Sequence, residues 1–110
     1  MTEKESKYLS DILSAIDLIE DFVKGINSFN AYKNDQKTKS AVERQLVIIG
    51  EAVNNFLRTS TANKLENAGK IIGFRNRLVH AYDSVDDNIV WVIIQKHLEP
   101  LKLEIREKTG

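Results

Sequence analysis

The chain has 110 residues, of which 42% are hydrophobic and 29% are charged, and this composition indicates a folded globular protein rather than a disordered one. Its 16 basic residues balance its 16 acidic residues, which excludes a general electrostatic affinity for nucleic acid, so any RNA-binding surface must be local. The chain has no cysteine and no apolar run of about 18 residues, so we expect no disulfide, thiolate metal site, signal peptide or membrane span, and a cytoplasmic location.

Residues 3–24 are predicted to form the first amphipathic helix. Thr2 and Glu5 have the spacing of a capping box, which marks a helix start. A stripe of apolar residues follows at steps of four, three and four: Ile12, Ile16, Ile19 and Val23. Gly25 is expected to end the helix, because glycine readily adopts the left-handed conformation of a helix C-cap.

The polar segment 27–39 is predicted to be a connector. It contains two aromatic residues, Phe29 and Tyr32, and we expect one helical turn that tucks both rings against the rest of the protein. We interpret this segment as structural and assign it no functional role.

The second long helix is predicted over about residues 38–58, with a capping-box spacing at Ser40 and Glu43. Its apolar stripe consists of Val42, Leu46, Ile49, Val53, Phe56 and Leu57. Gly50 within the stripe indicates the close approach of another backbone. The neighbouring Glu51 is either a functional carboxylate or an ion-paired surface residue, and we favour the second interpretation.

A turn at residues 59–63 and a short helix near 62–68, broken around Gly69, are expected to lead into a further amphipathic helix. The apolar positions of that helix are Ile71, Ile72, Phe74, Leu78 and Val79. Basic residues are concentrated here as a candidate RNA-binding patch: Lys64, Lys70, Arg75 and Arg77. The alternative interpretation of this patch is a solvated basic face.

The last helix is predicted over about residues 86–107, after a turn in which Ser84 and Asp87 have capping-box spacing. Pro100 is expected to kink or restart it. Nearly all of residues 89–94 are apolar, which suits burial in a bundle together with a dimer interface. The sequence therefore predicts one all-α domain over residues 1–110, an antiparallel up-and-down bundle of four main helices with short helical turns, forming a homodimer.

Residues 75–82, which read RNRLVHAY, combine side chains that suit chemistry on RNA. The Arg75 guanidinium has the planar shape that binds phosphate oxygens, and the His80 imidazole can accept or donate a proton near neutral pH. Against an RNA phosphodiester, the 2′-hydroxyl is a nucleophile already in place, and arginine would stabilise the charge of the pentacoordinate transition state without a metal. The alternative is that Arg75 forms a surface ion pair, His80 packs and Tyr82 lies at the edge of the core.

The helical repeat limits how these side chains can meet. Arg75 and Tyr82 are seven residues apart and fall on the same helix face, whereas Arg75 and His80 are separated by about 140° around the axis. Either the backbone bends or ends near His80, or a second chain completes the site. We favour the dimer, because two chains supply two histidines, one for each proton transfer.

With RNRLVHAY placed between two long helices, the chain resembles a HEPN domain and, more narrowly, is similar to the HepT toxins, which are paired with a minimal nucleotidyltransferase antitoxin, MntA. The resemblance covers nearly the whole chain, including the sequence IGEA at 49–52, FRNRLVHAYD and a final helix that contains tryptophan. Its most specific part is an arginine followed by asparagine, with histidine five and tyrosine seven positions after the arginine. All four residues are present: Arg75, Asn76, His80 and Tyr82.

The resemblance implies a metal-independent endoribonuclease that acts at a homodimer cleft without a cofactor. Arg75 and His80 would be catalytic, Asn76 would support their geometry, and Tyr82 would be the residue to which the antitoxin attaches AMP. The near-zero net charge mildly favours a structured target such as tRNA over broad mRNA cleavage. The competing hypothesis is a non-catalytic helical module, nucleotide-binding or an adaptor, that binds a nucleotidyltransferase partner.

Overall fold

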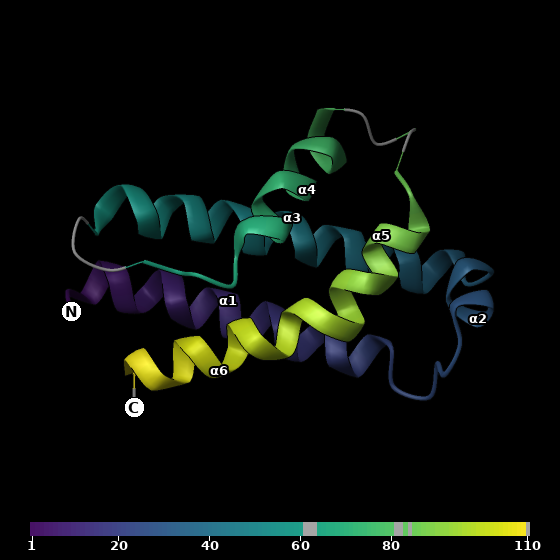
Figure 1. Cartoon of the computed structure of the whole chain (residues 1–110), viewed down its shortest axis with the longest axis horizontal. Coiled ribbons are helices and arrows are strands. Elements are labelled where there is room, and N and C mark those ends of the chain that lie inside the picture. Colours follow the sequence, from purple (N-terminus) through teal and green to yellow (C-terminus); the bar gives the residue numbers. More distant parts are fainter. Residues whose placement is uncertain (61–63, 81–82, 84, 110) are drawn as a thin grey trace.

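The helices α1 (Glu3–Phe22) and α3 (Gln36–Thr59) form the centre of the computed structural model, which describes residues 1–60, 64–80, 83 and 85–109. They lie side by side and run in opposite directions, and α6 (Leu98–Thr109) also packs against α1 (Figure 1). The helix α4 (Gly69–His80) packs against α3 and rises away from the layer formed by the other three (Figure 1). The described residues contain helices and no strand, which confirms the predicted all-α class.

The core lies where the apolar faces of these helices meet, as the predicted stripes require. Its largest fully buried side chains are Tyr32, Phe56, Leu9, Ile12, Ile16, Ile19, Leu46, Ile49, Ile71, Ile93, Leu98 and Leu101. Burying each such side chain contributes about 1.5–3 kcal/mol to folding, before the loss of conformational entropy is counted. In the part of the chain that the structure describes, no helix is both long and apolar enough to cross a membrane.

The predicted capping box of α1 is confirmed. The Thr2 hydroxyl accepts a hydrogen bond from the Glu5 amide at 3.1 Å, and the Glu5 carboxylate accepts one from the Thr2 amide at 3.0 Å. The helix ends at Phe22, slightly earlier than predicted, and Gly25 follows with a φ of 87°. This left-handed conformation suits glycine and turns the chain out of α1.

The predicted helical turn in the connector is α2 (Phe29–Lys33). The Tyr32 ring is fully buried and its centroid lies 5.4 Å from that of Trp91, so this turn is fixed to the bundle by aromatic packing. Phe29 is half-buried.

The helix α3 begins two residues before the predicted start near residue 38. The predicted cap at Ser40 is wrong, because Asp35 caps the helix instead. The Asp35 carboxylate accepts hydrogen bonds from the Thr38 amide at 3.0 Å and from the Thr38 hydroxyl at 2.8 Å. A carboxylate at this position satisfies backbone donors that have no partner within the helix, so α3 begins at Gln36.

The short helix predicted near 62–68 is also wrong for the described residues 64–68, which are not helical, and Gly69 begins α4 rather than breaking a helix. The Glu104 carboxylate of α6 accepts hydrogen bonds from the backbone amides of Glu66 and Asn67 at 2.7 Å and 3.0 Å. A side chain distant in sequence thus provides the acceptors that a local helix would have supplied. Glu104 thereby anchors the segment that enters α4.

The last helical region consists of α5 (Asp87–Val92), a π-helical segment (Ile93–His97) and α6. The Asp86 carboxylate caps α5 by accepting a hydrogen bond from the Asn88 amide at 2.8 Å, whereas the predicted cap, Ser84, lies outside the described residues. Pro100 has no amide hydrogen to donate to the preceding turn. The wider π turn lies just before it, so the predicted disturbance occurs ahead of the proline.

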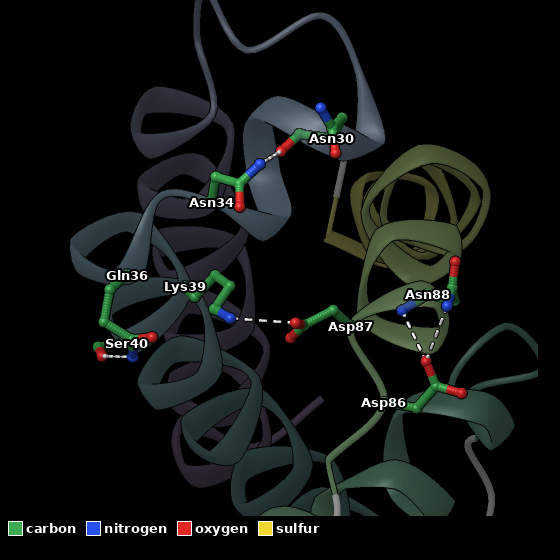
Figure 2. Close-up of polar contacts among 8 residues, drawn as sticks. All are labelled: Asn30, Asn34, Gln36, Lys39, Ser40, Asp86, Asp87 and Asn88. Atoms are coloured by element: carbon green, nitrogen blue, oxygen red, sulfur yellow. Dashed lines mark hydrogen bonds and ion pairs between the residues drawn. The ribbon is translucent and has the colours of Figure 1, made fainter.

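One ion pair fixes the start of α5 against α3. The Lys39 ammonium and the Asp87 carboxylate point toward each other across the space between these helices, 3.0 Å apart (Figure 2). Their side chains are only 15% and 21% exposed, so this pair is screened less than a surface pair.

Candidate active site

A polar pocket of about 530 Å³ lies between α3 and α4, and Arg75 projects into it. Its lining residues are Glu51, Asn54, Asn55, Leu57, Arg58 and Arg75. All except Arg75 come from the C-terminal half of α3, so the pocket depends on how α4 is placed against that helix.

Gly50 of α3 allows Arg75 to lie this close. A Cβ atom placed at Gly50 would stand 2.5 Å from both Cβ and Cγ of Arg75, whereas carbon atoms ordinarily stay about 3.5–4.0 Å apart. The sequence predicted that another backbone would approach Gly50. The structure shows instead that the aliphatic part of the Arg75 side chain lies directly on the backbone of α3.

The Arg75 guanidinium is held by long contacts. Its Nη2 lies 3.5 Å from Oε1 of Glu51, and its Nη1 donates to Oδ1 of Asn76 at 3.3 Å. Its Nε is buried and has no acceptor among the described residues. These contacts leave the guanidinium with N–H groups to donate to a further anion. The interpretation of Glu51 as an ion-paired residue is confirmed.

The structure places His80 apart from this cluster, as the last residue of α4, with an exposed side chain. On an ideal helix, residues five apart are separated by about 7.5 Å along the axis and about 140° around it. Among the described residues, no hydrogen bond or ion pair joins His80 to Arg75 or Asn76. The two predicted catalytic side chains of one chain thus leave α4 in different directions. Tyr82 lies outside the described residues.

The outward face of α4 carries the other candidates. Lys70, Gly73, Asn76, Arg77 and His80 are all exposed and lie within about one third of the helix circumference. A Cβ atom placed at Gly73 would meet no atom of the described residues within 4 Å, so in the described part of the chain this face is open around its midpoint.

The structure does not gather the four basic residues of the predicted patch on one surface. Arg75 packs on α3, while Lys70 and Arg77 lie on the opposite side of α4. Lys64 lines a separate hollow beside α6 together with three acidic residues: Glu66, Glu104 and Glu107. Lys108 lines the same hollow, so Lys64 lies among side chains of mixed charge and apart from the other three basic residues.

Comparison with known proteins identifies the family. The model of a family described as "Ribonuclease HepT-like" matches residues 12–107. The chain belongs to this HepT-like family. No solved structure matches the chain at a significant level.

Relatives of similar length support the HepT-like assignment. A protein of Thermococcus cleftensis described as "Probable ribonuclease HepT" is 36% identical over 106 residues, which cover 93% of each chain. Proteins of Methanocaldococcus jannaschii and Caldanaerobacter subterraneus, each described as a "Putative RNase", are 31% and 35% identical to this chain. The matches cover 96% and 91% of this chain, and 97% and 89% of those proteins. These comparisons confirm the predicted resemblance to HEPN domains and HepT proteins. They also confirm the predicted enzyme class, because the family and these relatives are described as ribonucleases.

The sequence analysis of this HepT-like chain singled out Glu51 but missed the polar helix face on which it lies. Glu51, Asn54, Asn55 and Arg58 are polar residues at positions i, i+3, i+4 and i+7, which place them on one face of α3. That spacing was available in the sequence as a signal, but the contact between this face and Arg75 became evident only from the packing of α4.

Among the described residues, no group of three or more His, Asp or Glu side chains is arranged to hold a metal ion.

Proposed function

We propose that this HepT-like protein is a metal-independent endoribonuclease toxin that cleaves RNA in a cleft between two copies of the chain, using Arg75 and His80. The observation that carries the proposal is the setting of Arg75. Its stem is fixed on Gly50, its guanidinium faces a polar pocket, and its long contacts leave donors for a phosphate.

The chemistry follows from the two side chains. The neutral His80 imidazole takes the proton of the 2′-hydroxyl, whose oxygen attacks the adjacent phosphorus, and the bond to the 5′-oxygen breaks. A protonated imidazole returns a proton to that leaving oxygen, giving a 2′,3′-cyclic phosphate and a 5′-hydroxyl. Arg75 stabilises the negative charge that develops on the phosphoryl oxygens. Asn76 helps to orient the guanidinium through its hydrogen bond to Nη1.

A second copy of the chain would bring an arginine and a histidine together, which one copy alone does not do. Because His80 and Arg75 leave α4 in different directions, a homodimer can bring two histidines and two arginines to one cleft. The outward face of α4 is open at Gly73. Exposed apolar side chains lie on α4 and α5, at Val79, Ile89 and Val92 (40%, 36% and 42% exposed), and give a second copy apolar surface to bury.

The same proposal includes regulation by a nucleotidyltransferase antitoxin that attaches AMP to Tyr82. In sequence, Tyr82 follows His80 by two residues, so an added phosphodiester would place negative charge next to the exposed end of α4. That charge and bulk would exclude the RNA phosphate. The nearly neutral net charge of the chain favours a structured RNA such as tRNA as the target.

Cleavage by the purified protein tests the enzyme. We expect fragments ending in 2′,3′-cyclic phosphate, resistance of the activity to EDTA, and loss of cleavage in Arg75→Ala and His80→Ala. His97→Ala is the matched control, because His97 is the second histidine of the chain and lies on the π-helical segment. Equal cleavage by all variants would identify a contaminating nuclease and favour a non-catalytic binding module.

Coexpression tests the regulation. The protein is produced alone and together with a nucleotidyltransferase encoded beside it, and its intact mass is measured. We expect growth inhibition that the partner relieves, with a mass increase in multiples of AMP that is absent in Tyr82→Phe. A neutralised complex with unchanged mass would show that the partner acts by binding alone.

A further inference from the structure

We propose that the Arg58 side of the α3–α4 pocket is a second RNA subsite, which binds the nucleotide next to the one whose phosphate contacts Arg75. This inference rests on the proposed function, since it extends the same RNA beyond the reacting phosphate. The substrate it specifies is a single-stranded stretch of RNA, such as a loop, with at least two consecutive nucleotides in contact with the protein.

The pocket extends well beyond Arg75 along α3. Glu51, the ion-pair partner of Arg75, and Arg58 are seven residues apart on one face of this helix, which corresponds to about 10 Å along its axis. The volume of about 530 Å³ lies within the range of small-molecule sites, so the pocket is larger than one phosphate requires.

Arg58 is arranged to bind an anion at the far end of this pocket. Its side chain is exposed, and its Nη2 donates a hydrogen bond to Oδ1 of Asn55, one turn earlier on α3. This bond limits the conformations of a long side chain before any ligand arrives. Among the described residues that line the pocket, Glu51 is the only acidic one, and it is paired with Arg75. Arg58 is thus the second cation in the pocket and is suited to a second phosphate.

The remaining lining residues suit a nucleobase. Because the side-chain Oδ1 of Asn55 accepts from Arg58, the side-chain Nδ2 of Asn55 is left as a donor. The side-chain amide of Asn54 offers both a donor and an acceptor. Leu57, which is 37% exposed, adds an apolar contact for a base that is not stacked in a helix. Proteins bind single-stranded RNA by combining such hydrogen bonds to base edges with contacts to base faces.

Arg58→Gln tests the subsite, and Arg44→Gln is the matched control. Arg44 is an exposed arginine on the same helix, about 21 Å from Arg58 along the axis. The Arg44→Gln substitution therefore removes the same charge as Arg58→Gln, but from outside the pocket. The probe is a fluorescein-labelled single-stranded RNA of mixed sequence with 2′-O-methyl groups throughout, which cannot be cleaved. Its affinity is measured by fluorescence anisotropy over a series of salt concentrations.

We expect Arg58→Gln to weaken binding about tenfold at low salt and to reduce the slope of log K against log salt by about 0.7, the value for one phosphate contact on a single strand. Arg44→Gln should change neither quantity by a comparable amount. Asn54→Asp places a negative charge in the same pocket without altering Arg58, and it should weaken binding as well. Circular dichroism checks that each variant is folded.

Equal affinity and slope for wild type and Arg58→Gln would overturn the subsite, as would equal losses in Arg58→Gln and Arg44→Gln. Cleavage of the unmodified RNA is measured in parallel. A wild-type protein that binds the probe through Arg58 but cuts no RNA would refute the proposed ribonuclease while leaving the subsite in place. A protein that cuts RNA with unchanged KM in Arg58→Gln would refute the subsite alone.

Discussion

Replacing Gly50 by alanine is expected to inactivate the protein without unfolding it. The added Cβ would stand 2.5 Å from two carbon atoms of Arg75, so the Arg75 stem must move by about 1 Å to restore an ordinary contact. Because Arg75 is the proposed catalytic arginine, we expect a displacement of that size to lower the cleavage rate about 100-fold, equivalent to about 2.7 kcal/mol of transition-state stabilisation. The expected change in the free energy of unfolding is smaller. Alanine favours a helix over glycine by about 1 kcal/mol, which offsets much of an overpacking cost of about 1–3 kcal/mol.

Gly73→Ala is the matched control for stability, because a Cβ there meets nothing within 4 Å among the residues that the structure describes. We expect this variant to be stabilised by about 1 kcal/mol in urea unfolding at low protein concentration, whereas Gly50→Ala should be unchanged or destabilised by up to about 2 kcal/mol. Single-turnover RNA cleavage then measures the effect on Arg75. A Gly50→Ala protein that gains as much stability as Gly73→Ala and cuts RNA at the wild-type rate would refute the reasoning.

Three further predictions concern the structure that surrounds the site. Glu104→Ala should destabilise the protein by about 1–3 kcal/mol in urea unfolding, because it removes the acceptor of the Glu66 and Asn67 amides before α4, and an unchanged midpoint would contradict this role. The Tyr32 hydroxyl is buried without a hydrogen-bond partner among the described residues, so Tyr32→Phe should leave stability unchanged or raise it by about 1 kcal/mol, and a loss would indicate a bound water. Burial, followed by the nearby Asp87 carboxylate, raises the pKa of Glu43 in the folded protein. The protonated Glu43 carboxyl therefore stabilises the folded protein when the pH is below the pKa of Glu43 in the unfolded chain. This stabilisation is lost as the pH rises through the higher pKa of Glu43 in the folded protein. Glu43→Gln should accordingly stabilise the protein at neutral pH, and this gain should disappear in acid, as measured by urea unfolding across a pH series.

The periodic parts of the fold were predictable from the sequence because each depends on neighbours a few residues away. The stripe of α1, its Thr2–Glu5 capping box and the helical turn that buries Tyr32 were all predicted and are observed. One error arose at the start of α3, where two residues could have capped the helix. Ser40 has capping-box spacing, yet the Asp35 carboxylate accepts hydrogen bonds from Thr38 and caps α3 five residues earlier.

The candidate site was predictable only in part. The sequence singled out Arg75, Asn76 and His80, and the structure shows the contact between the first two. It did not connect Arg75 with Gly50, nor with the polar face of α3 that ends in Arg58. It also treated Lys64 as part of one basic patch, whereas the structure places this residue beside the acidic side chains of α6.

The sequence by itself determined the helices, their buried faces and the chemical identity of the side chains at RNRLVHAY, because periodicity and residue type are properties of a short segment. Only the tertiary structure decided which helix covers Arg75, which carboxylate pairs with it, and which glycine leaves room for its stem. These relations join residues more than twenty positions apart, or depend on the direction in which a helix turns its side chains toward its neighbours. They are fixed by the packing of α4 across Gly50, which no local pattern encodes.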